Sequence, residues 1–174
     1  GYITARVFEK SKIPLVLTEH FSEMNKTSLT PYLLKLGKYT YSHMDRVITV
    51  SNSLADNIRD KFGIKAVTIP NIVDTISFEY REKKDKNIFC FVSTGGLIPR
   101  KGMDLLVQAF NEVFNGNNEV KLYIYGEGPE RRRLEKMIND FWLEKQVILM
   151  GLVNRKEIAN KMSKSDCFVL ASRR

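Results

Sequence analysis

Residues 88–104 read IFCFVSTGGLIPRKGMD, and this stretch decides the fold. Its first residues are mostly apolar and aromatic, as in a buried strand, and Gly95 and Gly96 follow directly. The next segment, residues 101–115, carries apolar residues at helical spacing. The order of strand, glycine-rich turn and helix predicts an α/β protein with parallel strands.

The same alternation of short apolar runs and helical segments extends to both sides. One helix is expected to follow a cap at Ser51 or Ser53 and to end at Gly63. Others are expected over 101–115 and 130–142, and a short one after Asn154. The predicted strands are 15–19, 46–51, 66–70, 88–94, 120–126, 146–151 and 166–172. The predicted apolar helix faces comprise Leu54, Ala55, Ile58 and Phe62; Leu106, Ala109, Phe110 and Val113; and Leu134, Met137, Ile138 and Phe141.

Residues 71–87 (NIVDTISFEYREKKDKN) have no sustained period and become strongly charged, which indicates a connection between domains. We therefore predict part of a first Rossmann-like domain at 1–75, a linker at 76–87 and part of a second such domain at 88–174. Each part is shorter than a typical open-sheet domain. We expect the sequence to begin inside a helix and to end directly after a strand.

The composition indicates a folded globular protein. The 174 residues are 43% hydrophobic and 28% charged, no apolar run approaches the roughly 20 residues that span a bilayer, and no signal peptide is visible. Cytoplasmic location is the expectation. Cys90 and Cys167 lie inside apolar runs and are expected in the core, not in a disulfide or metal site.

The net charge of +8 admits nucleic acid, an anionic membrane face or phosphorylated small molecules as partners. Most basic residues have acidic neighbours, and no RNA-binding or zinc-finger pattern is present, so no nucleic-acid partner is expected. Peripheral contact with the anionic inner membrane face stays open.

The stretch 93–104 also suits a diphosphate site. Gly95 and Gly96 allow a ligand to approach the backbone, and a helix beginning near Lys101 would point its amide groups and positive dipole end toward an anion. A lysine without an anion is unfavourable at that end, which favours a phosphate role for Lys101. The stretch matches neither a Walker motif nor a complete dinucleotide fingerprint.

The stretch resembles the segment that opens the C-terminal domain of family 4 glycosyltransferases, where a strand is followed by glycine, arginine and leucine, then proline, Lys-Gly and a helix. The resemblance extends in order over nearly the whole chain. Its further parts are DRVITVS at 45–51, IPNIVD at 69–74, YGEGP at 125–129, VILMGLV at 147–153 and FVLAS at 168–172.

The resemblance implies the GT-B fold, with two Rossmann-like domains. It implies transfer of a hexose-type sugar, with retention, from a nucleotide diphosphate sugar to a sugar or lipid-linked hydroxyl acceptor. No metal and no other cofactor is expected. Gly95, Gly96, Arg100 and Lys101 would bind the donor diphosphate, and Ser172 would either contact the donor or close its strand. His20 would lie beside the donor sugar as the catalytic residue.

Two departures from the family pattern stand out. The family's phosphate-binding arginine would fall at Gly96, where Arg100 is the nearest substitute. Its Glu-x7-Glu pair would lie beyond Arg174, so we expect the chain alone to show little transfer. Two other classes stay open: a non-catalytic nucleotide-sugar-binding domain, and an epimerase or phosphorylase of the same architecture.

Overall fold

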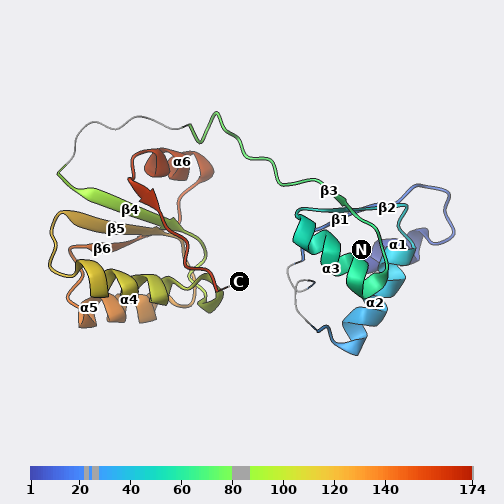
Figure 1. The fold of residues 1–174 in the computed structure, drawn as a ribbon, viewed down its shortest axis with the longest axis horizontal. Coiled ribbons are helices and arrows are strands. Elements are labelled where there is room, and N and C mark those ends of the chain that lie inside the picture. Colours follow the sequence, from blue (N-terminus) through green and yellow to red (C-terminus); the bar gives the residue numbers. More distant parts are fainter. Residues whose placement is uncertain (22–23, 25–27, 80–86, 174) are drawn as a thin grey trace. The chain divides into compact units, whose positions relative to one another are not determined.

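The computed structural model describes residues 1–21, 24, 28–79 and 87–173, and it divides into two compact units (Figure 1). Unit 1 is Gly1–Ile72 and unit 2 is Val73–Arg174. Residues 80–86, which belong to the predicted linker at 76–87, lie outside the described residues.

Unit 1 has a parallel sheet in the order β1-β2-β3. Ser51 caps the helix after β2, since its hydroxyl accepts a hydrogen bond from the Leu54 amide at 3.3 Å. Gly63 ends that helix in the left-handed conformation, so both ends form as predicted. The elements are α1 (Tyr2–Phe8), β1 (Val16–Glu19), α2 (Pro31–Ser42), β2 (Arg46–Thr49), α3 (Asn52–Phe62) and β3 (Val67–Thr68).

Unit 2 has a parallel sheet in the order β6-β5-β4-β7. In Figure 1, α4 and α5 lie on one face of this sheet and α6 on the other. The elements are β4 (Phe89–Thr94), the 3₁₀ turn η2 (Pro99–Lys101), α4 (Met103–Phe114), β5 (Val120–Tyr125), α5 (Arg131–Asp140), β6 (Val147–Gly151), α6 (Arg155–Ser163) and β7 (Cys167–Phe168).

The strand order of unit 2 reverses beside β4. The chain moves from β4 to β5 and β6 in one direction, and then returns through α6 to place β7 on the other side of β4. In open parallel sheets, ligands bind outside the carboxyl ends of the strands at such a switch point. The loops after β4 and β7 are therefore the expected ligand-binding loops.

The core of unit 2 fixes the position of these loops. Leu122 and Ile124 of β5 are fully buried against α4 and α5. On α4, Leu106 and Phe110 are buried as predicted, but Ala109 and Val113 are exposed, so these two assignments were wrong. The buried face contains Met103 and Val107 instead, which pack in the same core as Leu106 and Phe110. Cys90 and Cys167 are free and only partly buried.

Several boundaries differ from the sequence predictions, among them that of β3, which was expected over 66–70 and pairs only at Val67–Thr68. The helix expected from 101 begins at Met103, because Gly102 is left-handed (φ 63°) and separates it from the 3₁₀ turn. The strand expected over 166–172 pairs only at Cys167–Phe168. The helix expected over 130–142 spans Arg131–Asp140. The helix α2 had no counterpart among the predictions.

Among the described residues, none of the helices combines the length and the apolar character that crossing a bilayer requires.

Candidate functional site

The loop after β4 is fixed by backbone hydrogen bonds to the loop after β5. The Gly95 amide donates to the Tyr125 carbonyl at 3.0 Å, and the Leu97 amide donates to the Glu127 carbonyl at 2.8 Å. The Leu97 carbonyl in turn accepts from the Glu130 amide at 3.0 Å. A Cβ on Gly126, whose φ is 148°, would lie 1.9 Å from the Gly95 carbonyl oxygen, so only glycine allows this approach.

The turn η2 carries the two cations predicted to bind phosphate. Arg100 and Lys101 both lie in it, and the left-handed Gly102 follows. A Cβ on Gly102 would lie 2.0 Å from the Ala171 carbonyl oxygen, so the segment after β7 packs directly against this turn. Lys101 is thus not in the first turn of α4, as the sequence had suggested, but in the turn that precedes it.

Lys101 and Gly95 are brought together by this geometry. A Cβ on Gly95 would lie 3.6 Å from both Cδ and Cε of Lys101, so the lysine side chain extends over the glycine backbone. Lys101 is half-buried. Within the described ranges, its ammonium makes no hydrogen bond or ion pair with another side chain. The positive charge is therefore available at the carboxyl edge of β4.

Gly96 and Arg100 lie on the exposed side of the same loop. The nearest atom to a Cβ on Gly96 would be the Glu127 carbonyl oxygen, at 3.8 Å, and the φ of Gly96 is not positive. Neither conformation nor space therefore requires glycine at this position. The open space suits a ligand that approaches the backbone, and it also accommodates a longer side chain.

A buried carboxylate, Asp104, lies immediately behind the turn and was not singled out from the sequence. One guanidinium nitrogen of Arg173 donates to both of its oxygens, at 2.9 and 2.8 Å, and Arg133 approaches it to 3.4 Å. The hydrogen bond from Arg173 is the main reason that the pKa of Asp104 lies below its ordinary value. Asp104 is only 8% exposed, so its charge depends on these two partners.

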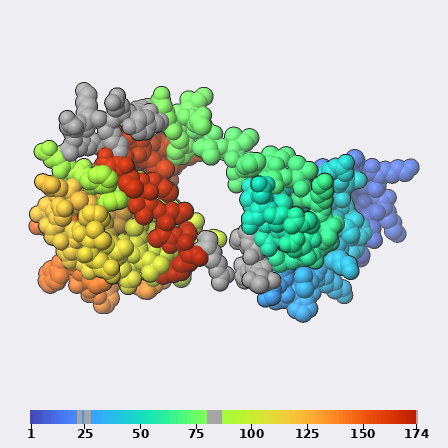
Figure 2. Space-filling model, viewed as in Figure 1, coloured from blue at the N-terminus to red at the C-terminus, as the bar shows by residue number. Residues whose placement is uncertain are grey.

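Ser172 lies next to Ala171 in the segment after β7, which Figure 2 shows in red on the surface of unit 2. Its Oγ is buried and has no hydrogen-bond partner among the described residues. A buried hydroxyl without a partner costs about 1–3 kcal/mol. The contact between Ser172 and a donor stays a prediction. Such a contact would supply the hydrogen bond that the buried hydroxyl lacks.

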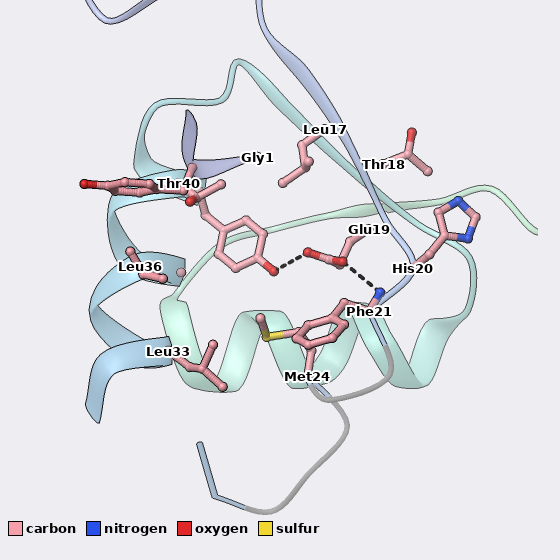
Figure 3. Close-up of a pocket in the computed structure, with 13 residues that line it drawn as sticks. Gly1, Leu17, Thr18, Glu19, His20, Phe21, Met24, Leu33, Leu36 and Thr40 are labelled. Atoms are coloured by element: carbon pink, nitrogen blue, oxygen red, sulfur yellow. Dashed lines mark hydrogen bonds between the residues drawn. The ribbon is translucent and has the colours of Figure 1, made fainter. Parts of the chain in front are cut away.

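In unit 1, His20 follows β1 and lines a cavity of about 580 Å³ together with Glu19 and Phe21. The Glu19 carboxylate accepts hydrogen bonds from the Tyr41 hydroxyl and the Phe21 amide, both at 2.8 Å. In Figure 3 the His20 ring lies on the opposite side of the chain from that carboxylate. His20 is exposed, while burial and the hydrogen bond to Glu19 raise the pKa of Tyr41.

No group of three or more histidine, cysteine, aspartate or glutamate side chains arranged to hold a metal occurs in the part of the chain that the structure describes. The site of unit 2 is built from backbone amides, glycines and cations, which suits an anionic ligand.

Two families match the chain, and together they cover it from end to end. The family described as Glycosyl transferases group 1 matches residues 73–174, and the one described as Glycosyltransferase Family 4 matches residues 1–76.

The chain belongs to the glycosyl transferases group 1 family.

Among relatives of this group 1 chain, the phosphatidylinositol N-acetylglucosaminyltransferase GPI3 subunit of Saccharomyces cerevisiae is 30% identical over 169 residues. The match covers 90% of this chain and 37% of the yeast protein. An uncharacterized glycosyltransferase of Methanocaldococcus jannaschii is 29% identical, with 96% of this chain and 44% of the relative covered. The chain thus spans less than half the length of these curated relatives.

Solved structures show that the group 1 chain has the GT-B fold. Anabaena HepE in complex with UDP superposes with a TM-score of 0.80 at 18% identity, over 99% of this chain and 50% of that one. A mutant of S. aureus TarM, solved with UDP and alpha-GlcNAc-glycerol, gives a TM-score of 0.66 at 26% identity, over 79% and 28% of the two chains. The predicted family and fold are confirmed.

Proposed function

We propose that the protein carrying this chain transfers a hexose-type sugar from a nucleotide diphosphate sugar to a hydroxyl acceptor, with retention at the anomeric carbon. Unit 2 binds the donor diphosphate in this proposal, and unit 1 belongs to the acceptor side. The observation that carries it is the position of Lys101, whose side chain extends over Gly95 at the switch point of the sheet. Family membership supports the reaction class.

The chemistry required of this site is electrostatic. As the glycosidic bond breaks, the leaving diphosphate gains negative charge, and a fixed ammonium stabilises it more in the transition state than in the ground state. Lys101 supplies that charge. Arg100, exposed in the same turn, is the second cation within reach of the loop. The open space at Gly96 leaves the loop backbone accessible to phosphate oxygens.

His20 completes the proposed catalytic set from unit 1. A neutral imidazole can hydrogen-bond a sugar hydroxyl or stabilise charge that develops on the sugar, and it need not act as a base. The exposed ring at the carboxyl end of β1 has the freedom that such a contact requires. Ser172 is proposed as a donor contact through its unpaired hydroxyl. No metal is part of the proposal.

The relatives indicate which substrates to try first. The yeast relative is named for transfer of N-acetylglucosamine to phosphatidylinositol, and the TarM structure contains UDP. We therefore propose UDP-N-acetylglucosamine as the first donor and a sugar or lipid-linked hydroxyl as the acceptor. A lipid-linked acceptor is compatible with peripheral contact between the basic protein and an anionic membrane face.

Calorimetric titration of UDP into the protein tests the proposal. Replacing Lys101 by alanine is expected to weaken UDP binding by about 1–3 kcal/mol, as loss of a charge-assisted hydrogen bond should. Lys145→Ala is the matched control, because this exposed lysine lies just before β6, at the amino end of that strand and so away from the proposed site. Equal affinity of the Lys101→Ala variant and the unsubstituted protein would remove Lys101 from the site.

A gain of affinity is expected from Gly96→Arg. The space around Gly96 accepts a side chain, and an added cation there would face the same phosphate groups. We expect UDP binding to tighten about tenfold, as one charge-assisted hydrogen bond provides. Gly96→Gln, with similar reach and no charge, is the control, and equal affinities of the two variants would contradict the electrostatic explanation.

Turnover of the full-length parent protein with UDP-N-acetylglucosamine then separates the functional classes. A glycosylated acceptor supports the transferase. Binding of UDP without any product would favour a non-catalytic nucleotide-sugar-binding domain, and an epimerised free sugar would favour an epimerase.

A further inference from the structure

The segment after β7 is tied to the turn η2 by one side chain, Arg173. We propose that Arg173 is a positioning residue, which holds the turn in the conformation that presents Lys101 to the donor diphosphate. The inference rests on the proposed function of Lys101. It assigns a role to a residue that neither the sequence motifs nor the family resemblance singled out.

Arg173 contacts the turn on both sides of Lys101. One of its guanidinium nitrogens donates to the carbonyl oxygen of Pro99, the first residue of the turn. The other donates to both oxygens of Asp104, near the start of α4, at 2.9 and 2.8 Å. The Arg173 backbone amide also donates to the Arg100 carbonyl at 2.9 Å. Arg173 therefore bridges the beginning of the turn and the helix that follows it.

The burial of Asp104 makes this bridge strong. The Asp104 side chain is only 11% exposed, so cationic partners favour its charged form. Its other partner, Arg133, lies farther away at 3.4 Å and is shared with Glu130, which it contacts at 2.6 Å. Arg173 is thus the principal partner of Asp104. Its removal leaves the negative charge of a buried carboxylate only partly compensated by Arg133.

Few internal contacts hold the turn itself. The Lys101 amide donates to the Ile98 carbonyl at 2.9 Å, and the Gly102 amide donates to the Pro99 carbonyl at 3.2 Å. Each of these bonds joins residues only three positions apart. The close contact between Gly102 and Ala171 is a packing contact and involves no charged group. Without Arg173 the turn would sample more conformations. Binding a diphosphate would then require ordering it first, and that entropic cost reduces affinity.

Two measurements test the proposal, and the first needs no ligand. Hydrogen–deuterium exchange of the peptide covering 99–105 is compared between the unsubstituted protein and Arg173→Met, which keeps most of the apolar stem and removes the guanidinium. Exchange in this peptide is expected to rise at least several-fold. Arg132→Met, at an exposed arginine of α5, is the control and should leave this peptide unchanged. Unchanged exchange in Arg173→Met would overturn the proposal.

The second measurement is UDP affinity in a double-mutant cycle. Arg173→Met is expected to weaken UDP binding about threefold to tenfold, and Asp104→Asn by a similar factor. Combined with Lys101→Ala, the Arg173 substitution should have a clearly smaller effect, because much of its effect acts through Lys101 and only the part through Arg100 remains. An undiminished loss in the Lys101→Ala background would mean that Arg173 contacts the ligand directly, which contradicts a positioning role.

The two measurements also separate this inference from the proposed function. If the unsubstituted protein binds no UDP, the proposed function fails, and the role of Arg173 in presenting Lys101 to the donor fails with it. The exchange experiment still decides whether Arg173 orders the turn. If UDP binds and Lys101→Ala weakens it, but Arg173→Met changes neither exchange nor affinity, the proposed function stands and the positioning role is wrong.

Discussion

At the scale of single residues, Gly102 and Gly116 show two different reasons for a glycine. Both are left-handed, with φ of 63° and 80°. A Cβ on Gly102 would lie 2.0 Å from the Ala171 carbonyl oxygen, whereas a Cβ on Gly116 would have no atom within 4 Å. Gly116 is thus needed only for its backbone conformation. Gly102 is needed for both its conformation and the approach of another segment.

We therefore predict different costs for the two alanine substitutions. Gly116→Ala should destabilise unit 2 by about 1–2 kcal/mol, the cost of a left-handed alanine. Gly102→Ala should cost about 1–3 kcal/mol more, because the segment after β7 must move. Denaturant unfolding followed by a probe in unit 2 measures both. Equal costs would show that Ala171 does not pack closely against Gly102 in solution.

The residues of the candidate site differ in how far the sequence revealed them. Gly95 and Lys101 lie six positions apart in one motif, and the structure brings them together as a local feature. Asp104 and Arg173 are 69 positions apart, and neither motif nor charge pattern connects them. Contacts of that kind depend on where β7 enters the sheet. The roles proposed for all of the site residues stay predictions, namely those of His20, Gly95, Gly96, Arg100, Lys101 and Ser172.

At the scale of elements, helix ends were predicted well where the signal is a side chain next to the helix. The short helix expected after Asn154 is α6, and the Asn154 side chain and Glu157 form a capping box at its start. The start of α4 was misplaced, because the left-handed Gly102 ends the turn η2, with its amide bonded to the Pro99 carbonyl, and so separates that turn from the helix. The helix α2 was missed, although Thr30 caps it and Pro31 is its first residue.

The cap of α3 gives a prediction at this scale, because the sequence alone left Ser51 and Ser53 as alternatives. Only Ser51 accepts a hydrogen bond from the Leu54 amide, at 3.3 Å. Ser51→Ala should therefore destabilise unit 1 by about 1 kcal/mol. Ser53→Ala, inside the helix, should cost nothing or slightly stabilise it. Thermal unfolding of unit 1 followed by circular dichroism compares them, and the reverse order would assign the cap to Ser53.

At the scale of the whole molecule, the strand order of unit 2 determines which loops meet. The loops after β4 and β7 flank the switch point at the carboxyl ends of the strands. The connection between α4 and β5 lies at the amino ends of the strands. The sequence predicted that the strands are parallel. It did not predict that β7 pairs with β4 and not with β6.

This topology predicts where UDP protects the backbone. Hydrogen exchange with saturating UDP should slow in the loop 95–98 and in the segment 169–173, because a bound ligand stabilises the state that holds it. Residues 115–119, between α4 and β5, should be unaffected. The two sets of peptides are compared in a single labelling experiment. Protection of 115–119 without protection of 95–98 would place the ligand elsewhere.

The sequence by itself determined the parallel α/β class, five of the seven strands with nearly their observed extents, and the motif around Lys101. It did so because strand and helix periodicity, helix caps and glycine turns are local properties of the chain. Its ordered motifs also led to the correct family. The tertiary structure alone decided that the segment after β7 packs on the turn after β4, and that Arg173 reaches Asp104 there. Those contacts follow from the return of β7 to the far side of β4, which is a global property of the fold.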